Sequence, residues 1–147
     1  MKILIVGVGS ILRGDDGIGT RVIDELDSED LPREVRLHSG DISGLDLLKV
    51  FPGSDRVIII DAADMGEEPG TIKVLSLEEI NTPAFKDKFS THGIGLLDSL
   101  TLGKQLDILP EIKIVAIQPE DTSFNLEMTD LIKNTIPAII ATVKTLI

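Results

Sequence analysis

The chain has 147 residues, of which 42% are hydrophobic and 27% are charged, which is the length and balance of one globular domain. It contains no cysteine, which excludes thiol proteases, disulfide scaffolds, thiolate zinc sites and iron–sulfur clusters. Twenty-five acidic and 14 basic residues give a formal net charge of −11, and the aromatic residues are four Phe without Trp or Tyr. This composition argues against nucleic acids and anionic membranes as partners.

The sequence also argues against membrane insertion. No run approaches the about 18 consecutive apolar residues of a membrane span. The apolar opening at residues 3–8 is too short for a signal-peptide core, and no small-residue cleavage site follows it. We therefore expect a cytoplasmic, monomeric protein in which residues 1–147 form a single domain.

Five runs predict β-strands, at residues 2–8, 34–38, 56–60, 71–75 and 112–117. The first and third are almost continuous Ile, Leu and Val, which is typical of strands covered on both faces. Only residues 62–70 separate the third strand from the fourth. Because this connection is too short for a helical crossover, the fourth strand is expected to run antiparallel, near an edge.

Four apolar stripes at helical spacing lie between and after these strands. The first predicts a helix after Asp15, with that residue as N-cap. In the last stripe Pro137 predicts a kink or break near Asn134. The stripes are Ile18/Val22/Leu26, then Leu45/Leu48/Phe51, then Ile94/Leu97/Leu100 ended by Gly103, and finally Met128/Ile132/Ile136/Ile139/Val143/Leu146. The alternation predicts a three-layer α/β/α domain with an approximately five-stranded, mostly parallel sheet.

Polar residues that follow the predicted strands are the first candidates for chemistry, because ligands of open α/β sheets bind at the carboxyl ends of strands. Asp15 and Asp16 follow the first strand, and Asp61 directly follows the third. His92 follows an irregular stretch and precedes a helix. Two carboxylates and an imidazole are therefore expected above one edge of the sheet. Such an oxygen and nitrogen donor set suits Ni²⁺, Co²⁺ or Zn²⁺.

Each candidate also has a purely structural interpretation. Asp15 is most simply a helix cap, Asp16 could only favour the helix dipole, and a single His92 is more often a loop histidine than a ligand. Asp61 is different, because a carboxylate after four apolar strand residues is costly to desolvate unless it is paired. Ser76 and Glu79 match a capping box, so Glu79 is interpreted as structural.

Two other ligand-binding folds fit less well. The Gly7-Val8-Gly9 segment follows a strand, but Leu12 stands where a dinucleotide-binding loop requires its third glycine. A receiver-like phosphoacceptor domain would also place acids after the first and third strands. Its lysine after the fifth strand is missing here, and Gln118 stands there instead.

Several ordered motifs resemble the [NiFe]-hydrogenase maturation endopeptidases, over about residues 1–130. Within this family, the motifs most resemble the branch that processes the large subunit of formate-hydrogenlyase-type hydrogenases. Ser10 departs from the Asn usual in the family. The motifs are Gly7-Val8-Gly9-Ser10-Ile11-Leu12, Gly14-Asp15-Asp16-Gly17-Ile18-Gly19, Ile60-Asp61-Ala62-Ala63-Asp64-Met65-Gly66, Pro69-Gly70-Thr71-Ile72, Ser90-Thr91-His92, Ile117-Gln118-Pro119-Glu120 and Met128-Thr129.

The resemblance implies an endopeptidase that removes a C-terminal extension from a hydrogenase large-subunit precursor after nickel insertion. It implies that Asp16, Asp61 and His92 recognise the nickel, and that the precursor carries this metal rather than the free enzyme. The general base stays open between a ligand carboxylate and Asp15. Two alternatives also stay open: a non-catalytic chaperone of the same nickel subunit, and a receiver-like module phosphorylated at Asp61.

Overall fold

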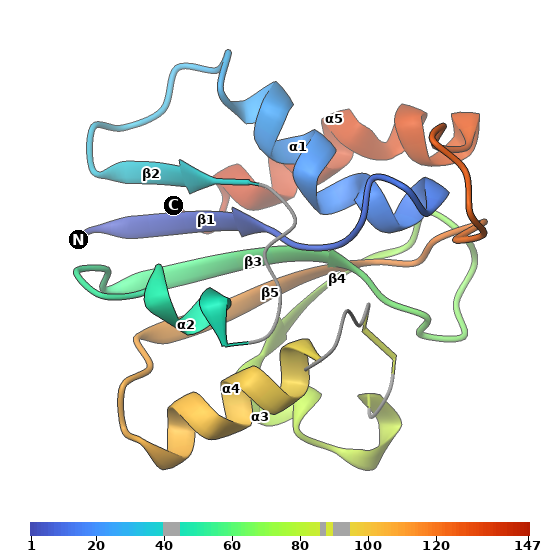
Figure 1. The fold of residues 1–147 in the computed structure, drawn as a ribbon. Helices are drawn as coiled ribbons and strands as arrows, with labels where there is room; N and C mark the ends of the chain where they lie inside the picture. The colour runs from blue at the N-terminus through green and yellow to red at the C-terminus, as the bar shows by residue number, and fades with distance from the viewer. Residues whose placement is uncertain (40–44, 86–87, 90–94) are drawn as a thin grey trace.

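The structure is a computed structural model that describes residues 1–39, 45–85, 88–89 and 95–147 (Figure 1). Its five-stranded sheet has the order β2-β1-β3-β5-β4, and only β4 runs antiparallel to its neighbour. The α/β class and the antiparallel fourth strand at an edge are both confirmed. The strands are β1 (Ile3–Gly7), β2 (Val35–His38), β3 (Arg56–Ala62), β4 (Ile72–Ser76) and β5 (Glu111–Ile117).

Helices cover both faces of this sheet (Figure 1). One face carries α1 (Ile18–Leu26) and α5 (Asp130–Lys144), and the other carries α2 (Asp46–Lys49), α3 (Leu77–Ile80) and α4 (Leu96–Gln105). Two short 3₁₀ helices are η1 (Gly14–Gly17) and η2 (Pro83–Phe85). No helix in the described part of the chain is long and apolar enough to cross a membrane.

Successive residues of β1 face the two layers of helices in turn. In β1, Ile3 and Ile5 pack in the core with α1 and α5, whereas Leu4 and Val6 pack in the core with α2, α3 and α4. Because successive strand residues point to opposite faces, a strand with helices on both sides needs apolar residues at every position. This explains the almost continuous apolar runs of β1 and β3.

The predicted break in the last helix is wrong, because α5 runs without interruption from Asp130 to Lys144. Four residues of its predicted stripe are buried against the sheet. Pro137 instead lies on the exposed side of the helix. There the carbonyl that loses its partner to proline can bind water, so the buried side of the helix keeps its packing.

The helix end predicted at Gly103 is also wrong, because α4 continues to Gln105. A Cβ atom on Gly103 would lie 2.5 Å from Leu109 Cδ2 and 3.0 Å from Leu48 Cδ2. This glycine therefore permits close packing rather than ending the helix. Ile94, the first residue of the predicted stripe, lies outside the described residues. The Ser76–Glu79 capping box at the start of α3 is confirmed.

Two glycines bring the start of α1 into backbone contact with the sheet. A Cβ atom on Gly19 would lie 2.3 Å from the Ile60 carbonyl oxygen and 2.7 Å from the Val8 carbonyl oxygen. A Cβ atom on Gly7 would lie 2.3 Å from the Gly19 carbonyl oxygen. No side chain fits between these backbones, so glycine on both sides brings η1 against the carboxyl ends of β1 and β3.

We predict that Gly19→Ala lowers the free energy of unfolding by about 3 kcal/mol, because the methyl group would force α1 away from the sheet. Urea denaturation measures this change. Gly53→Ala is the control, since Gly53 has φ +88° and no atom within 4 Å of the added Cβ. Its cost is backbone strain alone, about 1 kcal/mol. Equal losses in the two variants would contradict the packing argument.

Candidate active site

The candidate site lies at the carboxyl ends of β1 and β3, which are neighbours in the sheet. After β1 the chain continues through α1 to β2, which lies on one side of the β1–β3 pair. After β3 it continues to β4, which lies toward the other side of the sheet. Because the two connections diverge, the carboxyl ends of β1 and β3 form a topological switch point. Gly9, in the loop after β1, has φ +116°. A Cβ atom there would lie 2.0 Å from the Asp16 carbonyl oxygen and 3.4 Å from Asp61 Oδ1. Asp16 and Asp61 therefore both border Gly9.

Asp61 is fully buried at the end of the central strand. The predicted strand stopped at residue 60, but β3 continues to Ala62, and Asp61 pairs with Ala116 of β5. The carboxylate thus projects from the sheet itself rather than from a loop. The pairing of β3 with β1 reaches Ile60 and its pairing with β5 continues through Ala62, which fixes the backbone that carries the Asp61 side chain.

Asp16 is 6% exposed and is held by the turn that precedes it. The Ser10 backbone N–H donates to Asp16 Oδ2 at 2.9 Å, and the Asp16 N–H donates to the Arg13 carbonyl oxygen at 3.1 Å. Ser10 Oγ accepts a hydrogen bond from the Leu12 N–H at 3.2 Å, so the serine itself shapes this turn. The turn orients one carboxylate oxygen of Asp16 directly.

His92, the third predicted ligand, lies outside the described residues. Within the described ranges no group of three or more His, Cys, Asp or Glu side chains is arranged to hold a metal ion. Of the three predicted ligands, the described residues include Asp16, which is 6% exposed, and Asp61, which is fully buried, both at one edge of the sheet. Carboxylates in this position can ligate a divalent cation or accept a proton from water.

Asp15 is not the N-cap of α1, which corrects the sequence prediction; Gly17 occupies that position. The Asp15 carboxylate is fully buried and accepts hydrogen bonds from the β5–α5 connection. The Glu120 and Asp121 N–H groups donate to Oδ2 at 2.9 Å each, and the Thr129 N–H donates to Oδ1 at 2.8 Å. The Thr129 hydroxyl lies 2.9–3.0 Å from both oxygens. These donors occupy the carboxylate, so Asp15 is a structural anchor and not a free base.

Gln118 fastens the β3–β4 connection beside the site. Its Oε1 accepts a hydrogen bond from the Met65 N–H at 2.6 Å, and its Nε2 donates to Asp64 Oδ1 at 3.2 Å. The Gln118 amide, followed by the Gly66 N–H, holds the pKa of Asp64 below its ordinary value. The sequence places Gln118 after the fifth strand and within the Ile117-Gln118-Pro119-Glu120 motif, but it did not predict this hydrogen bonding, because the partners Asp64 and Met65 are more than 50 residues away in the chain.

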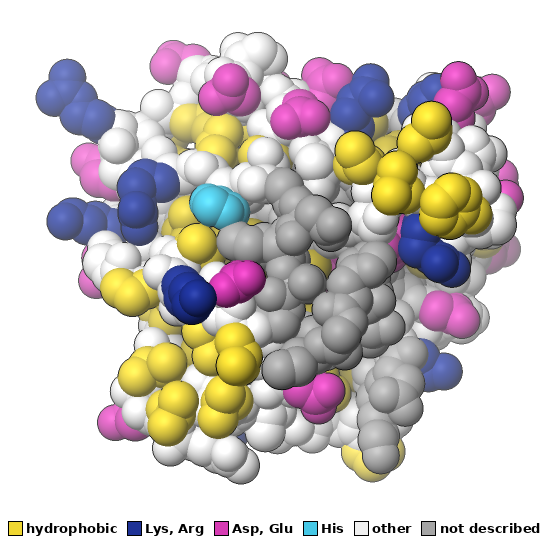
Figure 2. Space-filling view, in the orientation of Figure 1, with side chains coloured by type: hydrophobic (Ala, Val, Ile, Leu, Met, Phe, Trp, Pro, Cys, Tyr) yellow, Lys and Arg dark blue, Asp and Glu magenta, His cyan; other side chains and the backbone are white. Residues whose placement is uncertain are grey.

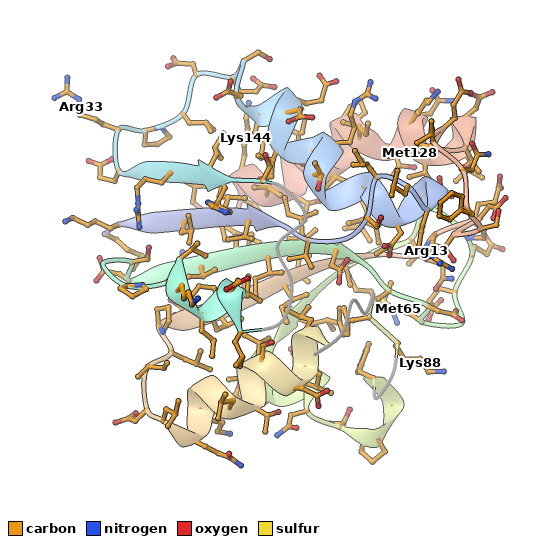
Figure 3. All side chains as sticks on the ribbon, in the orientation of Figure 1. Arg13, Arg33, Met65, Lys88, Met128 and Lys144 are labelled. Carbon is orange, nitrogen blue, oxygen red and sulfur yellow. The ribbon has the colours of Figure 1, made fainter. Side chains whose placement is uncertain are left out.

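Loop residues from three parts of the chain thus gather at one end of the molecule. Figure 3 shows Arg13, Met65 and Met128 at the end toward which β1 and β3 point. They belong to the β1–α1, β3–β4 and β5–α5 connections, respectively. In the last of these the Ser123 side chain and N–H lower the pKa of Asp121. Three connections that are held by hydrogen bonds therefore lie at the end of the molecule that carries the candidate site.

We predict that Asp15→Asn lowers the free energy of unfolding by about 3 kcal/mol, because an amide NH₂ would face N–H donors and the charge-assisted hydrogen bonds would be lost. Chemical denaturation measures this value. Asp30→Asn, at an exposed aspartate of the α1–β2 connection, is the control and should leave stability within about 0.5 kcal/mol. A neutral effect of Asp15→Asn would contradict the anchoring role.

Comparison with known proteins assigns a family to this architecture. The family model described as HycI, hydrogenase maturation protease, matches residues 20–145. The hydrogenase expression/formation protein HupD of Rhizobium leguminosarum bv. viciae is 32% identical over 144 residues, which cover 96% of this chain and 71% of HupD. The hydrogenase 2 maturation protease of Escherichia coli K12 is 34% identical over 137 residues, covering 90% of this chain and 82% of that protein.

A solved structure has the same fold. The hydrogenase maturating endopeptidase HybD of E. coli superposes with a TM-score of 0.85 at 32% sequence identity. The superposition covers 97% of this chain and 90% of HybD. The shared fold therefore extends over nearly the whole chain.

Proposed function

Because the chain belongs to the hydrogenase maturation protease family, we propose that it removes the C-terminal extension of a nickel-loaded [NiFe]-hydrogenase large-subunit precursor. The chain is accordingly a hydrolase of the endopeptidase type. The structural observation that supports this proposal most is that Asp16, which is 6% exposed, and Asp61, which is fully buried, both lie at the carboxyl edge of the sheet, where the Asp16 backbone and the Asp61 side chain border Gly9.

In this proposal Asp16, Asp61 and His92 bind the nickel that the precursor brings as part of the substrate. Binding the metal positions the scissile peptide bond next to it. Polarisation of the peptide carbonyl, or activation of a water molecule, by that metal accounts for hydrolysis without a serine or cysteine nucleophile. Asp15 is excluded as general base by its four hydrogen-bond donor groups, which leaves a ligand carboxylate for that role.

Family membership disfavours one of the two alternatives. This is the receiver-like module, because the matching family and its named members are maturation proteases. A nickel-subunit chaperone differs from a protease in one measurable respect, which is that it binds the precursor and does not cut it. The formate-hydrogenlyase-type branch, the cytoplasmic location and the monomeric state remain predictions that accompany this proposal.

The direct test is mass spectrometry of the large-subunit precursor from the same genome after incubation with this protein. We expect loss of one C-terminal peptide from the nickel-loaded precursor and an unchanged mass for the nickel-free precursor. Association of the two proteins with no change in mass would support the chaperone instead. Cleavage that is equally fast without nickel would contradict the role given to the metal.

We predict that Asp61→Ala lowers the rate of processing by about three orders of magnitude or more, because it removes a carboxylate from the metal-binding set. Processing of the nickel-loaded precursor gives the rate, and far-UV circular dichroism checks that the variant folds. Asp61→Asn should show the same loss with less change in volume. Asp30→Ala is the matched control at the opposite end of the sheet. Parental activity in both Asp61 variants would refute the assignment.

A further inference from the structure

Beside the candidate site, the molecule displays a group of exposed apolar side chains. We call Ile11, Leu12, Phe124 and Leu126 the apolar patch; their exposed fractions are 60%, 44%, 79% and 77%. Figure 2 shows hydrophobic side chains gathered next to a basic one at the end where Figure 3 labels Arg13 and Met128. Side chains of this kind cost free energy in water, and contiguous exposed patches commonly mark interaction surfaces.

The backbone beneath the apolar patch is held by hydrogen bonds. The Asn125 N–H donates to the Leu12 carbonyl oxygen at 2.9 Å, and the Gly14 N–H donates to the Asn125 carbonyl oxygen at 2.8 Å. The Asp15 carboxylate accepts hydrogen bonds from Asp121 and Thr129, which lie on either side of residues 124–126. The two segments that carry the apolar patch, residues 11–12 and 124–126, are therefore preorganised, which lowers the entropy cost of binding a partner.

The surroundings of the apolar patch are acidic. Next to it is a hollow of about 240 Å³ whose lining includes Asp121, Glu127 and Asp130. The nearby basic residues are Arg13, whose backbone pairs with Asn125, and Arg21, which lines a second hollow together with Leu126. The chain as a whole carries a net charge of −11. The surface therefore complements a partner that presents apolar side chains beside Lys or Arg.

The apolar patch is also continuous with the candidate site. Ile11 and Leu12 lie in the turn whose Ser10 N–H donates to the Asp16 carboxylate. The other end of this turn, the Arg13 carbonyl oxygen, accepts a hydrogen bond from the Asp16 N–H. A partner bound to the apolar patch therefore contacts the same turn whose two ends, Ser10 and Arg13, hold Asp16.

From these observations we propose that the apolar patch is the docking surface for the large-subunit precursor, which binds it through an apolar segment flanked by basic residues. This inference rests on the proposed function for the identity of the partner. The apolar patch is then a second place, apart from the metal-binding residues, where the precursor is recognised. The apolar contacts supply affinity, and the acidic rim favours the correct partner.

A second group of exposed apolar residues provides a matched control. Leu106 and Ile108, which are 57% and 51% exposed, lie in the connection between α4 and the start of β5. They therefore lie at the end of the sheet opposite the candidate site. Their charged neighbours in sequence are Lys104 and Asp107, which balance each other. Replacing these two residues removes a similar apolar surface without touching the site.

The experiment measures binding of the nickel-loaded precursor to the full chain carrying Asp61→Asn, so that cleavage does not interfere with the dissociation constant. Adding Phe124→Ser and Leu126→Ser should raise Kd by about tenfold or more. Adding Leu106→Ser and Ile108→Ser should leave Kd within about twofold. Adding Glu127→Gln should weaken binding more at low than at high ionic strength. The change in Tm of each variant checks that the fold is kept.

The outcomes separate this inference from the proposed function. Equal Kd values for the two double variants, or no binding of the precursor by the parent, would overturn the docking surface. Self-association of the free chain that disappears in the Phe124/Leu126 variant would assign the patch to a second copy and also overturn it. Cleavage is measured in parallel with the Asp61 side chain restored. Patch-dependent binding with no cleavage would refute the proposed function and leave the docking surface standing.

Discussion

The arrangement of the site depends on one buried carboxylate, that of Asp15. An ionised carboxylate without exposure to water must be satisfied by protein donors, and here the donors come from residues 120–129. This requirement joins the first turn after β1 to the segment that leads into α5, more than 100 residues later in the chain. Asp16 is the next residue, so the anchor also limits how far that carboxylate can move. Stability and site geometry thus have a common origin.

The glycines act together with this anchor. Gly7 and Gly19 allow the backbones of β1 and α1 to touch, and Gly9 leaves room for the Asp16 backbone carbonyl and the Asp61 side chain. A side chain at any of these positions would separate the strand edge from the 3₁₀ turn. Backbone packing therefore brings the backbone of Asp16 and the side chain of Asp61 to the same glycine. The glycine-rich pattern of residues 7–19 is explained by this packing and not by phosphate binding.

The sequence predicted the features that depend on local pattern. The sheet could be predicted from the alternation of strands and helices, and α1 from its amphipathic stripe. The antiparallel edge strand could be predicted from the length of the β3–β4 connection. The location of Asp16 and Asp61 near the carboxyl ends of β1 and β3 followed from the rule that parallel strands end at one edge, and their common role in a metal site stays a prediction. The partner of Asp15 could not be predicted in this way, because Thr129 is distant in sequence and a capping role fitted Asp15 equally well locally. Gly103 misled for a similar reason: its neighbours, Leu48 and Leu109, are set by tertiary packing.

The strand order has a consequence for how the protein forms. β4 pairs with β5, and β5 in turn separates β4 from β3. During synthesis β4 leaves the ribosome before the strand that admits it to the sheet, and the edge of β3 that carries Asp61 stays open until β5 arrives. The donors to Asp15 follow β5 directly, so sheet closure and site assembly are late events that involve contacts distant in sequence. A nascent chain therefore has no assembled site until nearly all of it has been made, which keeps incomplete molecules from acting on a precursor.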